Sequence, residues 1–69
     1  MPSISILLNG APRVVPASAT VTTLLAGLGL DPRTVVVEVN REIIRRPRLD
    51  KVRLTEGDQV EVVHFVGGG

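Results

Sequence analysis

The chain ends in a strand pattern that runs almost directly into three glycines. Residues 60–63 read Val-Glu-Val-Val, which has the period-two alternation of a strand with one face on a core. Gly67, Gly68 and Gly69 then close the sequence. Glycine weakens an ordered element because it loses much conformational freedom and has no side chain to pack. The pattern predicts a rigid strand followed by a flexible thread that carries a carboxyl group. A frayed terminus or a linker remnant would explain the same glycines, and both interpretations stay open at this point.

Length and composition narrow the classes of protein to which the chain can belong. Sixty-nine residues form one small domain. The formal net charge of +1, with a single Phe and no Trp or Tyr, argues against nucleic-acid binding, which needs positive charge and aromatic rings for stacking. The single His and the scattered carboxylates show no catalytic spacing, so we expect no enzyme and no metal site.

We expect no targeting signal, and the sequence offers no cysteine chemistry. The apolar run Ile4–Leu8 is too short for a signal peptide or a membrane span, so we expect no contact with a membrane. Without cysteine the chain has no disulfide, no thiolate metal ligand and no thiol nucleophile. This composition fits a cytoplasmic protein.

The first half of the chain predicts a hairpin and a helix. Ile4–Leu8 and Pro12–Pro16 are the expected strands, joined by Asn9-Gly10, a dipeptide suited to a tight turn. The prolines suit an edge strand. Thr20 can cap a helix whose apolar residues fall at i, i+3, i+4 and i+7, and Gly29 is placed to end it; those residues are Val21, Leu24, Leu25 and Leu28.

The second half predicts three more strands. Val35–Val39 is rich in β-branched residues and should lie inside a sheet. A turn at Asn40-Arg41 leads to a short strand over Glu42–Arg45. Residues 49–54 form an irregular segment or one helical turn that returns Leu49, Val52 and Leu54 to the core, and the turn Glu56-Gly57-Asp58 leads into the last strand.

These elements together predict an α+β fold. The order is strand, strand, helix, strand, short strand, strand, and the crossover through the helix implies a mixed sheet of four to five strands with the helix packed across one face. This is the β-grasp layout of ubiquitin-like domains. We expect residues 1–66 to form this domain and residues 67–69 to form a flexible C-terminal glycine tail.

Several short motifs occur together in a fixed order along the chain. They are Asn9-Gly10, Thr20-Val21, Leu24-Leu25, Val37-Glu38-Val39-Asn40, Glu56-Gly57-Asp58, Val60-Glu61 and the ending His64-Phe65-Val66-Gly67-Gly68-Gly69. Through these motifs the chain resembles the ThiS family of sulfur carrier proteins of thiamine biosynthesis over essentially its whole length. One departure is Arg41, where the family commonly has Gly in the turn.

The resemblance implies a chemistry centred on Gly69. An activating enzyme similar to ThiF would adenylate the Gly69 carboxylate with ATP and magnesium, and a sulfur donor, a cysteine desulfurase or sulfurtransferase, would convert the adenylate to a thiocarboxylate. The acceptor would be a thiazole synthase similar to ThiG. Gly67 and Gly68 would thread the tail into the partner's active site, where a Cβ would not fit. The carrier itself would bind no cofactor.

Docking on the partners is expected to use the sheet face opposite the helix. If Val60 and Val62 point to the core, then Glu61, Val63 and Phe65 point away from it, and Phe65 becomes a candidate anchor for a partner pocket. The alternative is that Phe65 folds back over the end of the core.

Other assignments stay open at the level of sequence. A related carrier would serve molybdopterin synthesis or tRNA thiolation, and a ubiquitin-like modifier or binding module would use the same fold without sulfur. The basic residues of the segment 41–53 either steer an acidic partner or form a solvated face. We expect a monomer that meets its partners transiently.

Overall fold

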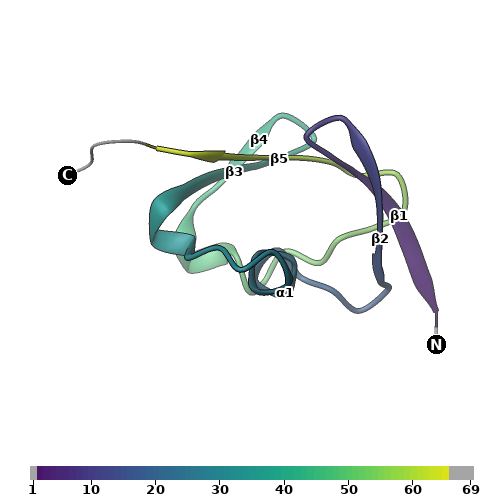
Figure 1. Cartoon of the computed structure of the whole chain (residues 1–69). Coiled ribbons are helices and arrows are strands. Elements are labelled where there is room, and N and C mark those ends of the chain that lie inside the picture. Colours follow the sequence, from purple (N-terminus) through teal and green to yellow (C-terminus); the bar gives the residue numbers. More distant parts are fainter. Residues whose placement is uncertain (1, 66–69) are drawn as a thin grey trace.

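A computed structural model describes residues 2–65, so the interpretation of Val66 and of the three glycines lies outside the described residues. The described chain forms five strands, one α-helix and two 3₁₀ turns (Figure 1). Their bounds are β1 Ser3–Leu8, β2 Ala11–Pro16, α1 Val21–Gly27, η1 Pro32–Thr34, β3 Val35–Val39, β4 Glu42–Ile44, η2 Arg46–Arg48 and β5 Gln59–His64.

The strands form one mixed sheet in the order β2-β1-β5-β3-β4. β1 and β5 run parallel at the centre, whereas β1 with β2, β3 with β4 and β3 with β5 are antiparallel. Figure 1 shows α1 on one side of this sheet. The α+β, β-grasp prediction is therefore confirmed, with β2 at an edge and β3 inside the sheet as expected.

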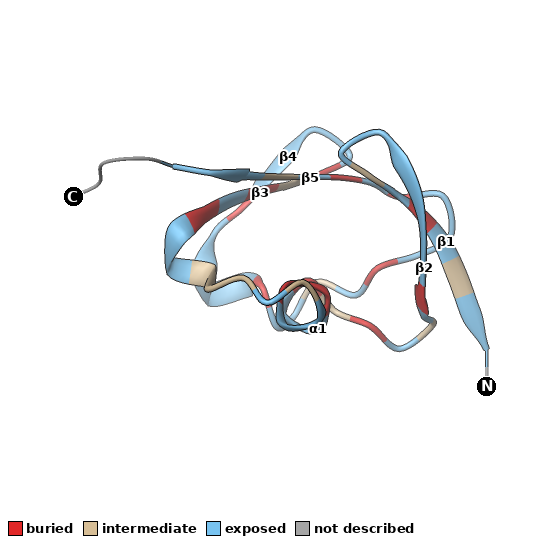
Figure 2. Cartoon of the chain, viewed as in Figure 1, coloured by how far each residue is buried: buried red, intermediate tan, exposed pale blue. Residues whose placement is uncertain are grey.

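The core lies between α1 and the sheet face that we call the inner face (Figure 2). Alternate residues of each strand point into it because side chains in a strand alternate between the two faces. Burying their apolar area supplies most of the free energy of folding. The buried apolar residues are Ile6, Val15, Ala19, Val21, Leu24, Leu25, Val35, Val37, Val39, Ile44, Leu49, Leu54 and Val60.

The helix begins and ends close to the predicted positions. Thr20 has an extended backbone, and its Oγ1 accepts a hydrogen bond from the N–H of Thr23 at 3.2 Å, so it is the N-cap. The helix ends at Gly27, and Gly29 takes the predicted left-handed conformation with φ of 72°. Leu28 lies past the last helical residue but still packs against the core.

The two hairpin turns both place a non-glycine residue at positive φ. Asn9 has φ of 51° before Gly10 at 84°, and Asn40 has φ of 52° before Arg41 at 71°. Two consecutive positive φ values match the right-handed twist of the strands that the turns join. Arg41 adopts this conformation although it carries a Cβ, so the departure from Gly does not prevent the turn.

The largest difference from the sequence prediction lies after β4. The strand ends at Ile44, one residue earlier than expected, because Arg45 turns away and precedes the 3₁₀ turn η2. The irregular segment that follows returns Leu49 and Leu54 to the core, and Val52 is partly buried there, as predicted. The first residue of α1 binds the backbone of this segment: the N–H of Val21 donates to the carbonyl oxygen of Val52 at 3.1 Å.

Candidate functional site

Strand β5 is the last element that the structure describes before the C-terminal glycines of the sequence. It lies at the centre of the sheet, between β1 and β3. Its pairing with β3 runs over five residue pairs, from Val39 opposite Val60 to Val35 opposite His64. One residue further on, the N–H of Phe65 donates to the carbonyl oxygen of Thr34 at 3.2 Å. The strand is thus held to β3 along its whole length, up to the last described residue.

The pairing of β5 with β1 is shorter, and Asn9 extends it. Only Gln59 and Val60 pair with β1. Beyond them, Asn9 donates its own N–H to the carbonyl oxygen of Val60 at 2.9 Å. Its side chain then bonds both polar groups of Val62: Oδ1 accepts from the N–H at 2.9 Å, and Nδ2 donates to the carbonyl oxygen at 3.3 Å. The amide side chain therefore takes the place that a further strand residue would occupy.

Asn40 performs a similar role at the start of β5. Its N–H donates to the carbonyl oxygen of Gln59 at 2.7 Å, and its Oδ1 accepts from the N–H of Gln59 at 2.9 Å. Its Nδ2 donates to Oδ1 of Asp58 at 3.0 Å. Each hairpin turn thus uses its asparagine to bind the backbone of β5, one from each side.

Asp58 is the one charged side chain among residues 2–65 that is buried. Burial opposes ionisation of the Asp58 carboxyl, but hydrogen bonds from Asn40 and from the N–H and hydroxyl of Thr55 outweigh it and lower the pKa below the ordinary value. The ionised carboxylate therefore ties the turn before β5 to the turn between β3 and β4.

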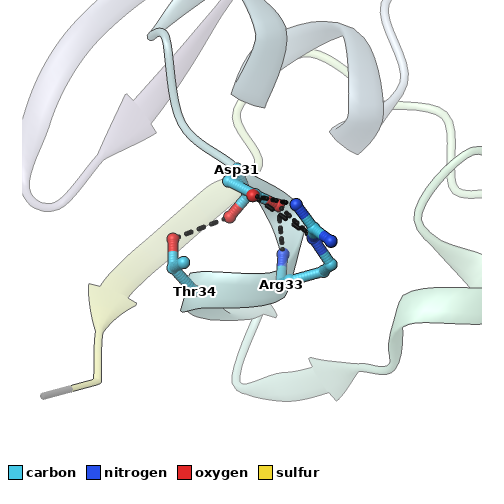
Figure 3. A network of polar contacts seen from close by, with 3 residues as sticks. All are labelled: Asp31, Arg33 and Thr34. Carbon is cyan, nitrogen blue, oxygen red and sulfur yellow. Dashed lines mark hydrogen bonds and ion pairs between the residues drawn. The ribbon is translucent and has the colours of Figure 1, made fainter. Parts of the chain in front are cut away.

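Asp31 fixes the start of β3, beside the end of β5 (Figure 3). Its carboxylate accepts a hydrogen bond from the backbone N–H of Arg33 at 2.8 Å. The same carboxylate forms an ion pair with Nη2 of Arg33 at 2.9 Å. These bonds lower the pKa of Asp31 to about 2. The hydroxyl of Thr34 donates to the carbonyl oxygen of Asp31 at 2.8 Å, so the residue that binds Phe65 is itself held in place.

The sheet face opposite α1, which we call the outer face, carries the predicted docking residues. Glu61 and Phe65 are exposed, and Val63 is 59% exposed, whereas Val60 is buried and Val62 is partly buried. The predicted alternation is therefore present. Phe65 is 51% exposed and does not cover the core. Whether these three residues contact a partner is not decided by their exposure and stays a prediction.

The structure adds three residues to this face that sequence reasoning did not select. Val36 lies opposite Val63, Glu38 lies opposite Glu61, and Ile43 lies opposite Glu38 on the other side. Val36 is 39% exposed and Ile43 is 56% exposed. The period-two pattern of the sequence was sufficient to predict that residues 36 and 38 point to the outer face. It could not predict which residues of the neighbouring strands lie opposite them. We call Val36, Glu38, Ile43, Glu61, Val63 and Phe65 the outer patch.

The described structure shows no binding site formed by His64 or by the basic residues of the segment 41–53. His64 shares the parity of the inner face but is exposed where β5 leaves the sheet. Arg53 donates from Nε to the carbonyl oxygen of Ala17 at 3.2 Å. Arg45 and Arg46 line a shallow groove between β3, β4 and η2. Among residues 2–65, the one ion pair is between Arg33 and Asp31, so no other basic side chain there is held by a carboxylate.

The described part of the chain has neither a metal-binding cluster nor a membrane-spanning helix. Residues 2–65 contain no group of three or more His, Cys, Asp or Glu side chains arranged to hold a metal ion. Within that range, no helix has the length and apolar character needed to cross a membrane.

The chain matches the model of a protein family over nearly its whole length. The model of the ThiS family matches residues 6–69. The sulfur carrier protein ThiS of Bacillus subtilis is 46% identical over 52 residues, which are 75% of this chain and 79% of the relative.

Two further relatives are much longer proteins. A thiazole synthase of Magnetococcus marinus is 48% identical over 62 residues, and one of Paramagnetospirillum magneticum is 44% identical over 64 residues. These alignments cover 90% and 93% of this chain but 19% and 20% of the relatives. The chain therefore spans about a fifth of the length of these two proteins.

Among solved structures, the fold is similar to that of a thiamine biosynthesis protein, ThiS, from Geobacter metallireducens. The crystal structure of that protein superposes with a TM-score of 0.83 at 36% sequence identity. The match covers 96% of this chain and 100% of that one. The similarity thus extends to the whole β-grasp domain.

Proposed function

The chain belongs to the ThiS family, and we propose that it is a sulfur carrier in thiamine biosynthesis whose Gly69 carboxyl group is adenylated and then converted to a thiocarboxylate. The observation that supports this most directly is the way β5 is held. It is bonded to β3 through Phe65 and to both hairpin turns through Asn9 and Asn40. A strand fixed in this way can present Gly67, Gly68 and Gly69 to an enzyme in a constant direction.

The proposed activation follows from the chemistry of a carboxylate. An α-carboxyl group has a pKa of about 3.3 to 3.7, so it is anionic at neutral pH and resists nucleophilic attack. In the proposed reaction, an oxygen of Gly69 attacks the α-phosphorus of ATP on a ThiF-like adenylyltransferase, and pyrophosphate leaves. The terminal sulfur of a persulfide on a cysteine desulfurase or sulfurtransferase then attacks the carbonyl carbon, and AMP leaves. A thiol reductant then cleaves the resulting acyl disulfide, which releases the Gly69 thiocarboxylate and leaves the donor sulfur in a new disulfide. ATP and magnesium are bound by the activating enzyme, not by the carrier.

The glycines suit this chemistry because the activating enzyme must close around the terminal carbonyl and exclude water. Each Cβ on the tail would have to fit the same channel. Sulfur held on the tail is then delivered at high effective concentration instead of diffusing as sulfide. In this scheme the carrier is a substrate of its partners and has no catalytic residue of its own.

The proposed acceptor is a ThiG-like thiazole synthase. Two proteins named thiazole synthase contain a segment similar to this chain, which supports a partnership between the two activities. We infer a cytoplasmic location because the activation step consumes ATP. For docking, we propose that the outer patch contacts the partner, with Phe65, Val63 and Glu61 as its predicted members.

The decisive experiment is reconstitution. The chain, a ThiF-like enzyme, ATP, magnesium and a sulfur donor are incubated, and the intact mass is measured. We expect a gain of about 16 Da, since one oxygen is replaced by sulfur. Protein purified from its native host establishes first whether the mature chain ends at Gly69. A chain that shows no pyrophosphate release and no added sulfur would refute the proposal.

The same preparation decides between acceptors. The sulfur-loaded chain is offered to a thiazole synthase, to a molybdopterin synthase subunit and to a tRNA-thiolating enzyme, and loss of the added mass is followed for each. We expect transfer to the thiazole synthase. Transfer to one of the other two would retain the carrier chemistry and correct the pathway, whereas attachment of the chain to lysines of other proteins would identify a modifier.

A further inference from the structure

Two carboxylates face each other at the centre of the outer patch. Glu38 on β3 lies directly opposite Glu61 on β5, and Ile43 continues the same row on β4. Backbone hydrogen bonds join Thr34 to Phe65 and Asn40 to Gln59, at the two ends of the β3–β5 ladder. Every second residue pair of an antiparallel ladder is hydrogen-bonded, so counting inward from either end makes Glu38 and Glu61 a hydrogen-bonded pair. The Cα atoms of such a pair are about 5.5 Å apart, and both side chains lie on one face.

Neither carboxylate has a partner within residues 2–65. No ion pair joins Glu38 or Glu61 to a basic side chain there, and neither side chain accepts a hydrogen bond from those residues. Like charges directly opposite each other on a sheet destabilise it. The isolated fold therefore gains nothing from this pair, although the chain has eight basic residues.

The surroundings of the pair are apolar on one side, whereas the next row on the other side is formed by the polar residues Asn40 and Gln59. Ile43 flanks it on β4, Val36 and Val63 form the next row of the sheet, and Phe65 follows Val63 at the end of β5. All four of these side chains are at least 39% exposed. Exposed apolar side chains that are gathered in this way are typical of a protein contact surface. The outer patch thus combines a pair of unpaired carboxylates with apolar side chains on one side of it, and Arg45 and Arg46 line the adjoining groove without forming an ion pair with either glutamate.

We propose that the outer patch docks on the adenylating partner through an arginine of that partner, which binds Glu38 and Glu61 together. A guanidinium group has five N–H donors in a rigid planar fork, so it can serve two adjacent carboxylates at once. The four apolar side chains exclude water from one side of this contact. This inference rests on the proposed function, because it names the contact that brings the Gly69 tail to its activating enzyme.

Other occupants fit the patch poorly. A second copy of the chain docked by two-fold symmetry would present the same surface, and four carboxylates would then meet. An anionic membrane surface would repel the pair. A basic protein surface relieves the repulsion and covers the apolar residues, so it is the occupant that the charges favour.

The test measures two properties of each variant: its stability, which should increase, and its affinity for the activating enzyme, which should decrease. We expect Glu38→Gln, Glu61→Gln and the double variant to unfold at a higher urea concentration than the wild-type chain, because the repulsion is removed. In pyrophosphate release by the ThiF-like enzyme, the KM for each variant should rise at least fivefold, and that of the double variant at least tenfold, with kcat unchanged. The wild-type KM should also rise with salt more steeply than that of the double variant.

The matched control is Glu42→Gln. Glu42 is an exposed carboxylate on β4 but has the opposite parity to Ile43, so it lies off the outer patch. Its KM should remain within twofold of the wild-type value. A double variant with wild-type KM would overturn the inference while leaving the proposed function intact. A wild-type chain that releases no pyrophosphate would refute both, and a variant that changes self-association measured by sedimentation instead of KM would identify a second copy as the occupant.

Discussion

The side chain of Asn9 bonds both backbone polar groups of Val62, accepting from the N–H at 2.9 Å and donating to the carbonyl oxygen at 3.3 Å. The two residues are 53 positions apart in the sequence. This contact continues the pairing of β5 past the end of β1, so a hairpin turn controls the strand that leads to the glycines.

Asn9→Gly should therefore loosen β5 without disturbing the turn. Glycine accepts the positive φ of this position but makes neither bond to Val62. We expect a loss of about 1–2 kcal/mol in the free energy of unfolding, measured by urea denaturation. Amide exchange of Val62 should accelerate more than that of Val37 on the neighbouring strand. Equal acceleration at both amides would show that the bond has no local effect.

Asp58 should make the stability depend on pH in the acid range. The pKa of Asp58 is lowered in the folded chain. Its contribution to the free energy of unfolding is therefore fully present above the pKa of an unfolded Asp, about 3.9, and is lost as the pH falls through the folded pKa. The urea midpoint of the wild-type chain should fall between about pH 4 and pH 2, and Asp58→Asn should flatten that fall. The control is Asp50→Asn, since Asp50 is exposed and accepts no hydrogen bond from residues 2–65. An identical pH dependence in both variants would contradict the assignment.

Leu25 should be one of the most sensitive core positions. Its side chain is fully buried in the stripe of α1 that faces the sheet. Leu25→Ala should lower the free energy of unfolding by about 2–5 kcal/mol, since it removes apolar contacts and leaves a cavity. A domain of this size has a total of only about 3–10 kcal/mol, so partial unfolding at 37 °C is expected. Thr22→Ala, on the exposed side of the same helix, should change the unfolding free energy little.

Phe65 should act as an anchor for the activating enzyme. It is 51% exposed on the outer patch and lies two positions before Gly67 in the sequence. Phe65→Ala should raise the KM for the chain in pyrophosphate release about tenfold, corresponding to about 1.4 kcal/mol of lost contact. Val14→Ala is the control, because Val14 is 66% exposed on the edge strand β2 and lies outside the patch. Equal KM values for both variants would exclude Phe65 from the contact.

Gly68→Val and Gly69→Val should leave the fold intact and abolish adenylation. The added side chain must enter the channel that admits the tail. The measurement is pyrophosphate release, with circular dichroism as the check on folding. Gly27→Ala is a suitable control, because the added Cβ meets no atom within 4 Å apart from its chain neighbours and the backbone of its own helix, and the residue has no positive φ. Unchanged release from either tail variant would count against the proposed role of the glycines.

Local patterns in the sequence were sufficient for most of the architecture. The period-two runs predicted the strands, the i, i+3, i+4, i+7 spacing predicted α1, and the dipeptides Asn9-Gly10 and Asn40-Arg41 predicted both hairpins. Each of these signals depends on residues a few positions apart, where side-chain direction follows from backbone geometry. The direction of Glu61, Val63 and Phe65 on the sheet followed in the same way.

The partners of those residues were decided only by the tertiary structure. Strand order and register place Glu38 opposite Glu61, Asn9 beside Val62 and Asp58 beside Asn40, across 18 to 53 residues of sequence. The sequence by itself thus determined which elements form and which face of each is apolar. The folded chain determined which side chains meet, because long-range pairing arises from packing of the whole sheet on α1 and from no local preference.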